Sequence, residues 1–254
     1  MCPGAGRVGL VPRELVAHCL LVETADRLVL VDTGFGVDDL KQGMRRLGPS
    51  PLLLGVRRDL GLTALHQVRA LGHRPEDVTD IVLTHLDLDH AGGLPDFPHA
   101  QVHVRATELA AARRPGLQER ARYVPAQWAH GPRWQEHADG GDSWFGFDSV
   151  SVIGDDVVMV PLRGHTRGHT GVAVRRPTGG WLLHAGDAYF HTGDKEQPRH
   201  CPAGLRAFQR VMAIDNAARL HNLARLQQLH REHGDEVTIF CAHDKTELEA
   251  LRTL

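Results

Sequence analysis

The chain has 254 residues, of which 42% are hydrophobic and 24% charged, and its 29 Lys+Arg against 31 Asp+Glu give a formal net charge of −2. This length and composition fit one large α/β domain with a sizeable buried core. The near-neutral balance provides no field that would attract nucleic acid or an anionic membrane, and no apolar run approaches the length of a membrane span. We therefore expect no nucleic-acid and no membrane partner.

The first residues and the cysteines bear on the cellular compartment. The opening seven residues contain no apolar stretch of the kind found in export signals. The four cysteines show neither CxxC pairing nor the density of a disulfide scaffold: Cys2, Cys19, Cys201 and Cys241. These features predict a reduced, cytoplasmic protein. The 18 histidines are many for this length, so most of them are expected at the surface or in packing.

Strands and helices are predicted to alternate through the first half of the chain. Hydrophobic patterning and turn residues predict strands over 15–24, 27–31, 78–83 and 100–104, and helices over 37–47, 62–71 and 106–114. Pro115-Gly116 ends the last of these helices. The strand over 78–83 leads directly into the most informative motif of the chain.

The segment 115–148 lacks clean periodicity. It concentrates aromatic residues in a chain that is only 5% aromatic, namely Tyr123, Trp128, Trp134, Trp144, Phe145 and Phe147. One interpretation is an insertion packed on the outside of a sheet. The other, which we favour slightly, is a lid or pocket wall that gives a substrate apolar contact.

Strands resume in the second half. They are predicted over 149–153, 156–160, 170–174, 180–184 and 237–240, with a long helix over 203–233 and a closing helix over 245–253. Four leucines of the long helix are spaced to face the core: Leu220, Leu223, Leu226 and Leu229. From composition and pattern alone, the fold class is α/β.

The stretch His85-Leu-Asp-Leu-Asp-His90 places four metal-capable side chains within six residues, directly after a strand. Alternate side chains of an extended backbone share a face, so His85 and Asp87 can converge on one ion. As the chain turns, Asp89 and His90 can reach a second site nearby. The glycines at 92 and 93 tolerate the positive φ and the close approach that such a turn requires.

Matching partners lie downstream, each at the end of a predicted strand. They are the segments Gly164-His-Thr-Arg-Gly-His169, His184-Ala-Gly-Asp187 and Cys241-Ala-His-Asp244, each of which offers a histidine or an aspartate. Strand ends at one sheet edge are a rigid way to present ligands to a metal. The sequence therefore predicts a composite metal site.

These motifs resemble those of the metallo-β-lactamase superfamily of dinuclear metallohydrolases. The family pattern is His-x-His-x-Asp-His, then a His in a Gly-His-Thr loop, then a Gly-Asp, then a late His, and Val31-Asp-Thr-Gly34 matches a further family motif. The resemblance covers nearly the whole chain. It implies an αββα sandwich of two mixed β-sheets flanked by helices, formed as a single domain over 1–254 with the aromatic-rich segment as an insertion.

The resemblance also implies the ligands. His85, Asp87 and His165 would form the first metal site; Asp89, His90 and His243 would form the second; Asp187 would bridge the two. Asp32 would orient a ligand imidazole through its other nitrogen. His169, the second histidine of its loop, is the alternative to His165 but fits a structural role better.

Asp87 departs from the pattern, which has histidine at this position. Imidazole suits zinc, whereas carboxylates lean toward harder ions, so we expect two divalent ions with zinc first and manganese or iron as alternatives. Three aspartates and one hydroxide would leave the dinuclear core formally neutral. That core should be a weaker Lewis acid than in an Asp87→His variant, with a higher pH optimum or a softened zinc preference.

The implied activity is hydrolysis of a small carbonyl ester by a metal-bridging hydroxide, with a lactone of the acyl homoserine lactone kind favoured. Asp89 could pass a proton to the leaving group, and Tyr189 could donate a hydrogen bond to the substrate carbonyl, although a packing role suits Tyr189 equally. The alternatives are a glyoxalase II-like thioesterase, a mononuclear iron dioxygenase of the same superfamily, and a non-catalytic sensor. A secreted β-lactamase is disfavoured by the start of the chain, and a homodimer agrees with the habit of the family.

Overall fold

The computed structural model describes residues 14–138 and 140–252. The first half contains β1 (Leu20–Glu23), β2 (Leu28–Val31), α1 (Val37–Gln42), α2 (Met44–Leu47), α3 (Ser50–Leu53), α4 (Ala64–Ala70), β3 (Val78–Val82), β4 (Gln101–Arg105), α5 (Ala106–Arg113) and β5 (Arg133–His137). The second half contains β6 (Asp142–Trp144), β7 (Phe147–Ile153), β8 (Val157–Pro161), β9 (Thr170–Arg175), β10 (Trp181–His184), α6 (Ala203–Met212), α7 (Asn216–His233), β11 (Val237–Phe240) and α8 (Lys245–Leu251). Short 3-10 turns occupy Leu60–Leu62, Pro75–Asp77, Leu94–Asp96, Pro125–Gln127 and Thr192–Asp194.

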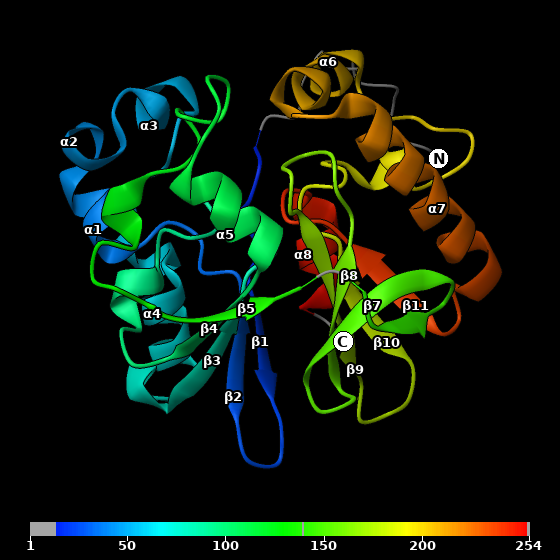
Figure 1. Cartoon of the computed structure of the whole chain (residues 1–254), viewed down its shortest axis with the longest axis horizontal. Helices are drawn as coiled ribbons and strands as arrows, with labels where there is room; N and C mark the ends of the chain where they lie inside the picture. The colour runs from blue at the N-terminus through cyan, green and yellow to red at the C-terminus, as the bar shows by residue number, and fades with distance from the viewer. Residues whose placement is uncertain (1–13, 139, 253–254) are drawn as a thin grey trace, which may run out of the picture.

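Two mixed sheets form the centre of the molecule, with helices on the outer side of each (Figure 1). The first sheet has the order β1-β2-β3-β4-β5, in which only the β1–β2 pair is antiparallel. The second has the order β11-β10-β9-β8-β7-β6, in which only the β10–β11 pair is parallel. The predicted αββα sandwich of two mixed sheets is therefore confirmed.

The alternation of strand side chains explains the layers. In β2, Val29 and Val31 join a cluster with Met159 and Val172 of the second sheet, so these faces pack against each other. The intervening Leu28 and Leu30 face the other way, toward α4 and α5. The outer face of the second sheet packs in the same manner on Leu223, Leu226 and Leu229 of α7. Alternate residues thus serve two cores, as a strand buried on both faces requires.

Two predicted helices are each divided in two. The helix predicted over 37–47 breaks at Gly43, which has φ +54°, and α1 ends there. The helix predicted over 203–233 breaks between Met212 and Asn216, where the Asp215 side chain caps α7 by accepting the N–H of Ala218 at 3.0 Å. A threefold spacing drifts by about 60° per step around a helix of 3.6 residues per turn, so Leu220 lies off the face that the later leucines bury. Leu220 is 40% exposed, and its prediction as a core residue was wrong.

The segment 115–148 contributes an edge strand to each sheet, β5 to the first and β6 with the start of β7 to the second. Most of its aromatic side chains join the cores. Tyr123 is buried in the first outer cluster, and Trp144 and Phe147 are buried in the second, where Trp144 meets Trp181 edge to face at 5.6 Å. This placement supports packing rather than a lid for these three residues.

Three cysteines of the described chain, Cys19, Cys201 and Cys241, are free thiols, whereas Cys2 lies outside the described residues. The end of the predicted closing helix, Thr253, also lies outside them. Within residues 14–138 and 140–252, none of the helices combines the length and the apolar character needed to cross a bilayer.

Candidate metal centre

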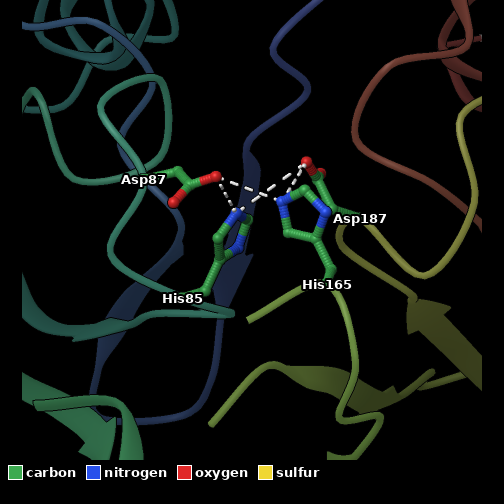
Figure 2. A group of neighbouring side chains, drawn as sticks. All are labelled: His85, Asp87, His165 and Asp187. Atoms are coloured by element: carbon green, nitrogen blue, oxygen red, sulfur yellow. Dashed lines mark hydrogen bonds and ion pairs between the residues drawn. The ribbon is translucent and has the colours of Figure 1, made fainter. Parts of the chain in front are cut away.

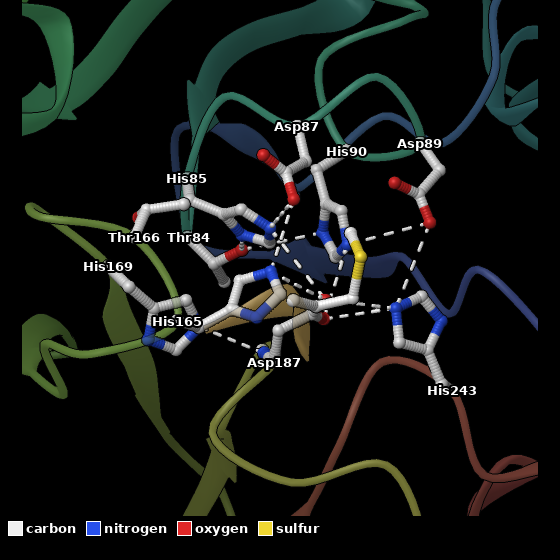
Figure 3. Close-up of polar contacts among 12 residues, drawn as sticks. Thr84, His85, Asp87, Asp89, His90, His165, Thr166, His169, Asp187 and His243 are labelled. Carbon is white, nitrogen blue, oxygen red and sulfur yellow. Dashed lines mark hydrogen bonds and ion pairs between the residues drawn. The ribbon is translucent and has the colours of Figure 1, made fainter. Parts of the chain in front are cut away.

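All seven predicted ligands lie in loops that follow strands. His85, Asp87, Asp89 and His90 are in the loop after β3, and the other three follow β8, β10 and β11 of the second sheet: His165, Asp187 and His243. Figure 3 shows the two sets of loops converging on one point between the sheets. The site is thus assembled from both halves of the fold.

Four of these residues form a first group, shown in Figure 2. Oδ2 of Asp87 lies 3.4 Å from Nε2 of His85 and 3.1 Å from Nε2 of His165. Oδ2 of Asp187 lies 3.8 Å and 3.2 Å from the same two nitrogens. A tetrahedral zinc ion with bonds of about 2.0–2.2 Å sets its ligand atoms about 3.3–3.6 Å apart, so this spacing suits such an ion.

A second group contains Asp89, His90 and His243. Oδ2 of Asp89 lies 4.0 Å from Nε2 of His90 and 3.7 Å from Nε2 of His243. The other oxygen of Asp187, Oδ1, lies 3.3 Å and 3.1 Å from these nitrogens. Asp187 therefore contacts both groups, Oδ1 the second group and Oδ2 the first group as well as Nε2 of His243, so this carboxylate has the geometry of a bridge between two ions.

The polar atoms at the centre need a partner that the protein does not provide. Nε2 of His85, Nε2 of His90 and Oδ1 of Asp187 are buried and have no hydrogen-bond partner among the described residues. Buried polar atoms without partners are costly, and three of them pointing at one place suit a bound cation. The donor set of imidazole nitrogens and carboxylate oxygens therefore fits two divalent ions. Zinc, manganese and iron(II) all accept such donors.

The outer ring nitrogens are held by a chain of hydrogen bonds. Nδ1 of His90 lies 2.8 Å from Oδ2 of Asp32, which also accepts the hydroxyl of Thr84 at 2.7 Å. The Thr84 oxygen in turn lies 2.9 Å from Nδ1 of His85. Since Thr84 donates to Asp32, it accepts from His85, so Nδ1 of both histidines carries the proton and Nε2 presents its lone pair to the centre. Asp32 thus orients His90, as expected.

The glycines of the motif act through close approach. A Cβ at Gly92 would lie 2.3 Å from Oδ2 of Asp39 and 2.7 Å from the carbonyl oxygen of Gly34. The loop after β3 therefore rests directly on the loop after β2. Neither Gly92 nor Gly93 has a positive φ, so that part of the expectation was wrong.

The Gly-His-Thr loop packs against the start of α7 and the break before it. Gly164 has φ +132°, and a Cβ there would lie 2.3 Å from the backbone nitrogen of Arg219. The amides of Ile214 and Asp215, in the break before α7, donate to the carbonyl oxygens of His165 and Gly164 at 3.1 and 2.9 Å. The division of the predicted long helix therefore positions a ligand loop.

His169 and His184 are engaged elsewhere. Nδ1 of His169 lies 2.8 Å from the carbonyl oxygen of Leu162, and its Nε2 accepts the amide of Asp187 at 2.8 Å. His169 thus positions the bridging residue, and His165 is the histidine of this loop that faces the first group. Nε2 of His184 lies 2.7 Å from the carbonyl oxygen of His18, which suits packing.

Tyr189 is placed differently from the substrate-binding role considered for it. Its ring is fully buried in the outer cluster of the second sheet, and its hydroxyl donates to the Glu247 carboxylate at 3.1 Å. Burial and the neighbouring Glu247 raise the pKa of Tyr189 well above its usual value. We therefore correct the expectation to a packing role.

Sequence reasoning missed two residues that contact the ligand loops. Glu108, at the start of α5, is fully buried and accepts hydrogen bonds from the loops after β3 and β8. Arg122 pairs with both oxygens of Asp87 and is itself buried. Neither belongs to a metal-binding motif. Glu108 lies near the start of a helix and Arg122 in a segment without periodicity, and neither position marks a residue that contacts a metal site.

The fold agrees with comparisons to known proteins. The model of the metallo-beta-lactamase superfamily matches residues 12–199. The chain belongs to the metallo-β-lactamase superfamily. A probable metallo-hydrolase of Mycobacterium bovis is 44% identical over 238 residues, which are 91% of this chain and 75% of that protein. An N-acyl homoserine lactonase, AttM, of Azorhizobium caulinodans is 34% identical over 137 residues, 53% of this chain and 49% of that protein.

Solved structures of the superfamily share the fold. An N-acyl homoserine lactone hydrolase with N-hexanoyl-L-homoserine at its catalytic metal centre superposes with a TM-score of 0.68 at 21% identity, over 93% of this chain and 84% of that one. The dizinc quorum-quenching lactonase AidC gives 0.63 at 18% identity, over 91% and 73%. With its metallo-hydrolase relatives, this membership makes the protein a hydrolase of the metallo-β-lactamase superfamily. The predicted family and enzyme class are confirmed.

Proposed function

We propose that the protein is a dizinc hydrolase of small carbonyl esters, and that its substrate is a lactone of the acyl homoserine lactone class. The observation that carries the proposal is Asp187, whose two oxygens face two adjacent ligand groups 3.1–3.8 Å away. The lactonase relative AttM and the lactonase structures support the choice of bond. The first site would be held by His85, Asp87 and His165, and the second by Asp89, His90 and His243, with Asp187 shared.

Two bound divalent ions would supply a nucleophile at neutral pH and polarise the substrate carbonyl. The residues of the chain then have distinct tasks. Side chains of Asp87 and Asp187 are 8% and 4% exposed, whereas Asp89 is 23% exposed, so the open side of the centre lies at Asp89. Asp89 would hold the proton that passes to the leaving alkoxide. Phe190, 4.6 Å from the His243 ring, would exclude water beside it.

The test joins metal analysis to turnover on the same sample. Protein purified without added metal is analysed for metal per chain, then assayed with acyl homoserine lactones of short and long acyl chains and with acyl thioesters, following acid release. We expect about two zinc ions per chain and lactone turnover. In His243→Ala we expect the zinc of the second site and the lactone turnover to be lost. Turnover of thioesters alone would replace the proposal with a thioesterase, and one iron without hydrolysis would replace it with the dioxygenase.

Location and assembly remain expectations from the sequence. We infer a cytoplasmic metabolite hydrolase, since the three cysteines of the described residues are free thiols, as is usual in a reducing compartment. A homodimer is the assembly to test by light scattering on the same preparation.

A further inference from the structure

Arg122 reaches into the first ligand group from the segment 115–148. Its side chain is 6% exposed, and its Nε donates to Oδ1 of Asp87 at 2.9 Å. Its Nη2 donates to Oδ2 of Asp87 and contacts Nε2 of His165. Its Nη1 donates to the carbonyl oxygens of His165, at 3.3 Å, and Met212. A guanidinium has five N–H donors, so every donor of this buried cation has a partner.

Two of these partners are atoms that a metal ion would use. Oδ2 of Asp87 and Nε2 of His165 belong to the first ligand group, and they lie 3.1 Å apart. A neutral imidazole nitrogen has one lone pair, which can accept a hydrogen bond or bind a metal but cannot do both. A guanidinium and a divalent ion a few ångströms apart also repel strongly at a buried site. Arg122 and the first ion therefore exclude each other from His165.

In the part of the chain that the structure describes, the second group has no such competitor at its ligand atoms. Nε2 of His90 has no hydrogen-bond partner among the described residues. Nε2 of His243 lies near Oδ1 and Oδ2 of Asp187, both at 3.1 Å, and near Oδ2 of Asp89 at 3.7 Å. These neighbours are all carboxylate oxygens. The two groups therefore differ in the charge that faces an incoming ion.

We propose that Arg122 competes with the first metal ion for Asp87 and His165, so that the two ions bind with unequal affinity and the second site fills first. Asp87 is part of the same device, because a carboxylate at this position gives the guanidinium a partner that histidine would not. To admit the first ion, Arg122 withdraws from Nε2 of His165. The inference rests on the metal ligands of the proposed function and not on its substrate.

The affinities test the proposal directly. Metal-stripped protein is titrated with zinc in competition with a chromophoric chelator. We expect two phases in the native protein, separated by about 100-fold or more, and in Arg122→Met a first-site affinity raised at least about tenfold with the second site changed less than about threefold. A first-site affinity that falls or stays the same in Arg122→Met overturns the proposal, because the guanidinium would then be supporting the ion.

A matched control removes a similar pair away from the centre. Arg46 is 12% exposed and donates to the buried Asp39 at 2.7 Å and to the carbonyl oxygen of Ala126 at 2.7 Å. Arg46→Met therefore deletes a guanidinium from a buried carboxylate without touching a ligand. It should leave both zinc affinities within about twofold of the native values. A tenfold rise in Arg46→Met would attribute the Arg122 effect to general loosening and overturn the proposal.

A second measurement needs no variant. Crystals of the native protein are grown with one equivalent and with excess zinc, and anomalous scattering locates the ions. We expect the first equivalent between Asp89, His90 and His243, and in excess zinc an ion beside His165 with Arg122 moved off Nε2. Equal filling of both sites at one equivalent contradicts only this inference. Zinc at neither site, even in excess, contradicts the proposed metal centre as well.

Discussion

Glu108 accepts the backbone N–H of Leu86 on one carboxylate oxygen at 3.0 Å and the backbone N–H of Gly168 on the other, also at 3.0 Å. The hydroxyls of Tyr123, at 3.1 Å, and Thr166, at 2.7 Å, complete its four hydrogen bonds. One fully buried side chain therefore fixes the distance between the loop after β3 and the loop after β8, which supply three of the four residues of the first group.

Glu108→Gln should lower both stability and zinc affinity. The amide of glutamine turns an N–H₂ toward two of these donors, which leaves buried groups unsatisfied at a cost of about 2–4 kcal/mol. Urea unfolding measures the first effect and chelator competition the second, where we expect a loss of about tenfold. Glu136→Gln is the control, because Glu136 is 42% exposed and pairs with Arg113 in a surface salt bridge. Equal stability of the two variants would contradict the role of Glu108.

Asp32→Asn should weaken the second zinc site more than the first. Asparagine replaces the charged carboxylate that accepts the Nδ1–H of His90 by a neutral amide. Loss of such a partner costs about 10- to 100-fold in metal affinity. Asp80→Asn is a matched control, since Asp80 is also buried and lies 3.0 Å from Nε2 of His103. It should lower stability without changing zinc affinity. A comparable loss of affinity in both variants would assign the effect to stability alone.

Asp87→His, which restores the family pattern, should be destabilising by itself. Arg122 would then be a buried cation beside two imidazoles, and breaking a buried pair in this way costs about 3–5 kcal/mol. Adding Arg122→Met should recover most of that loss. Unfolding free energies of the native, two single and double variants give the coupling, which we expect to exceed about 2 kcal/mol. Additive values would show that the two side chains do not depend on each other.

The same pair changes the charge argument made from the sequence. Asp87 adds one negative charge relative to histidine, but the guanidinium bonded to it adds one positive charge. Any difference in pH optimum between the native protein and an Asp87→His variant therefore has to be read in an Arg122→Met background. In the Arg122→Met background, we still expect the centre with Asp87 to be a weaker Lewis acid than the centre with histidine at this position.

Tyr189→Phe should leave ester turnover within about twofold and lower stability by about 1 kcal/mol, the usual value of one hydrogen bond. The expectation follows from the buried hydroxyl and its bond to Glu247. Steady-state kinetics and urea unfolding separate the two effects. A fall of tenfold or more in kcat with unchanged stability would instead show that Tyr189 contacts the substrate.

Zinc binding to the second site should release a proton between about pH 6.5 and pH 9. Burial lowers the pKa of His243, but the carboxylates of Asp187 and Asp89 outweigh it and raise the pKa to about 9. Because the pKa is raised, the bound proton stabilises the metal-stripped protein fully below pH 6.5, and this contribution is lost as the pH rises through 9. Calorimetric titrations in buffers of different ionisation enthalpy count the proton. Zinc binding without proton release at pH 7.5 would contradict the assignment.

The grouping of the seven candidate ligands could be predicted because each of them follows a strand that the local sequence indicates. His85 and Asp87 follow a strand, and their spacing places them on one face of an extended backbone. Arg122 could not be predicted in this way. It lies in a segment without periodicity, and its partners Asp87 and Met212 are 35 and 90 residues away in the chain. Only the folded arrangement brings them together.

The division of the predicted helix over 203–233 has a similar cause. Nothing in the apolar spacing between Met212 and Asn216 indicates a break. The amides of Ile214 and Asp215 instead donate to carbonyl oxygens of the His165 loop, and the Asp215 side chain caps the helix that follows. Tertiary hydrogen bonds thus override a local preference, at the point where the helical layer meets the metal loop.

Each ligand group draws two side chains from the first half of the chain and two from the second, counting the shared Asp187 with the second. A bound ion is therefore a cross-link between the two sheets, comparable in topology to a disulfide that joins distant parts of a secreted domain. Removing the ion is therefore expected to abolish catalysis and also to remove a cross-link between the two sheets. If the two ions bind with unequal affinity, the two sheets are cross-linked in two steps. The stability of the fold then depends on the concentration of available metal.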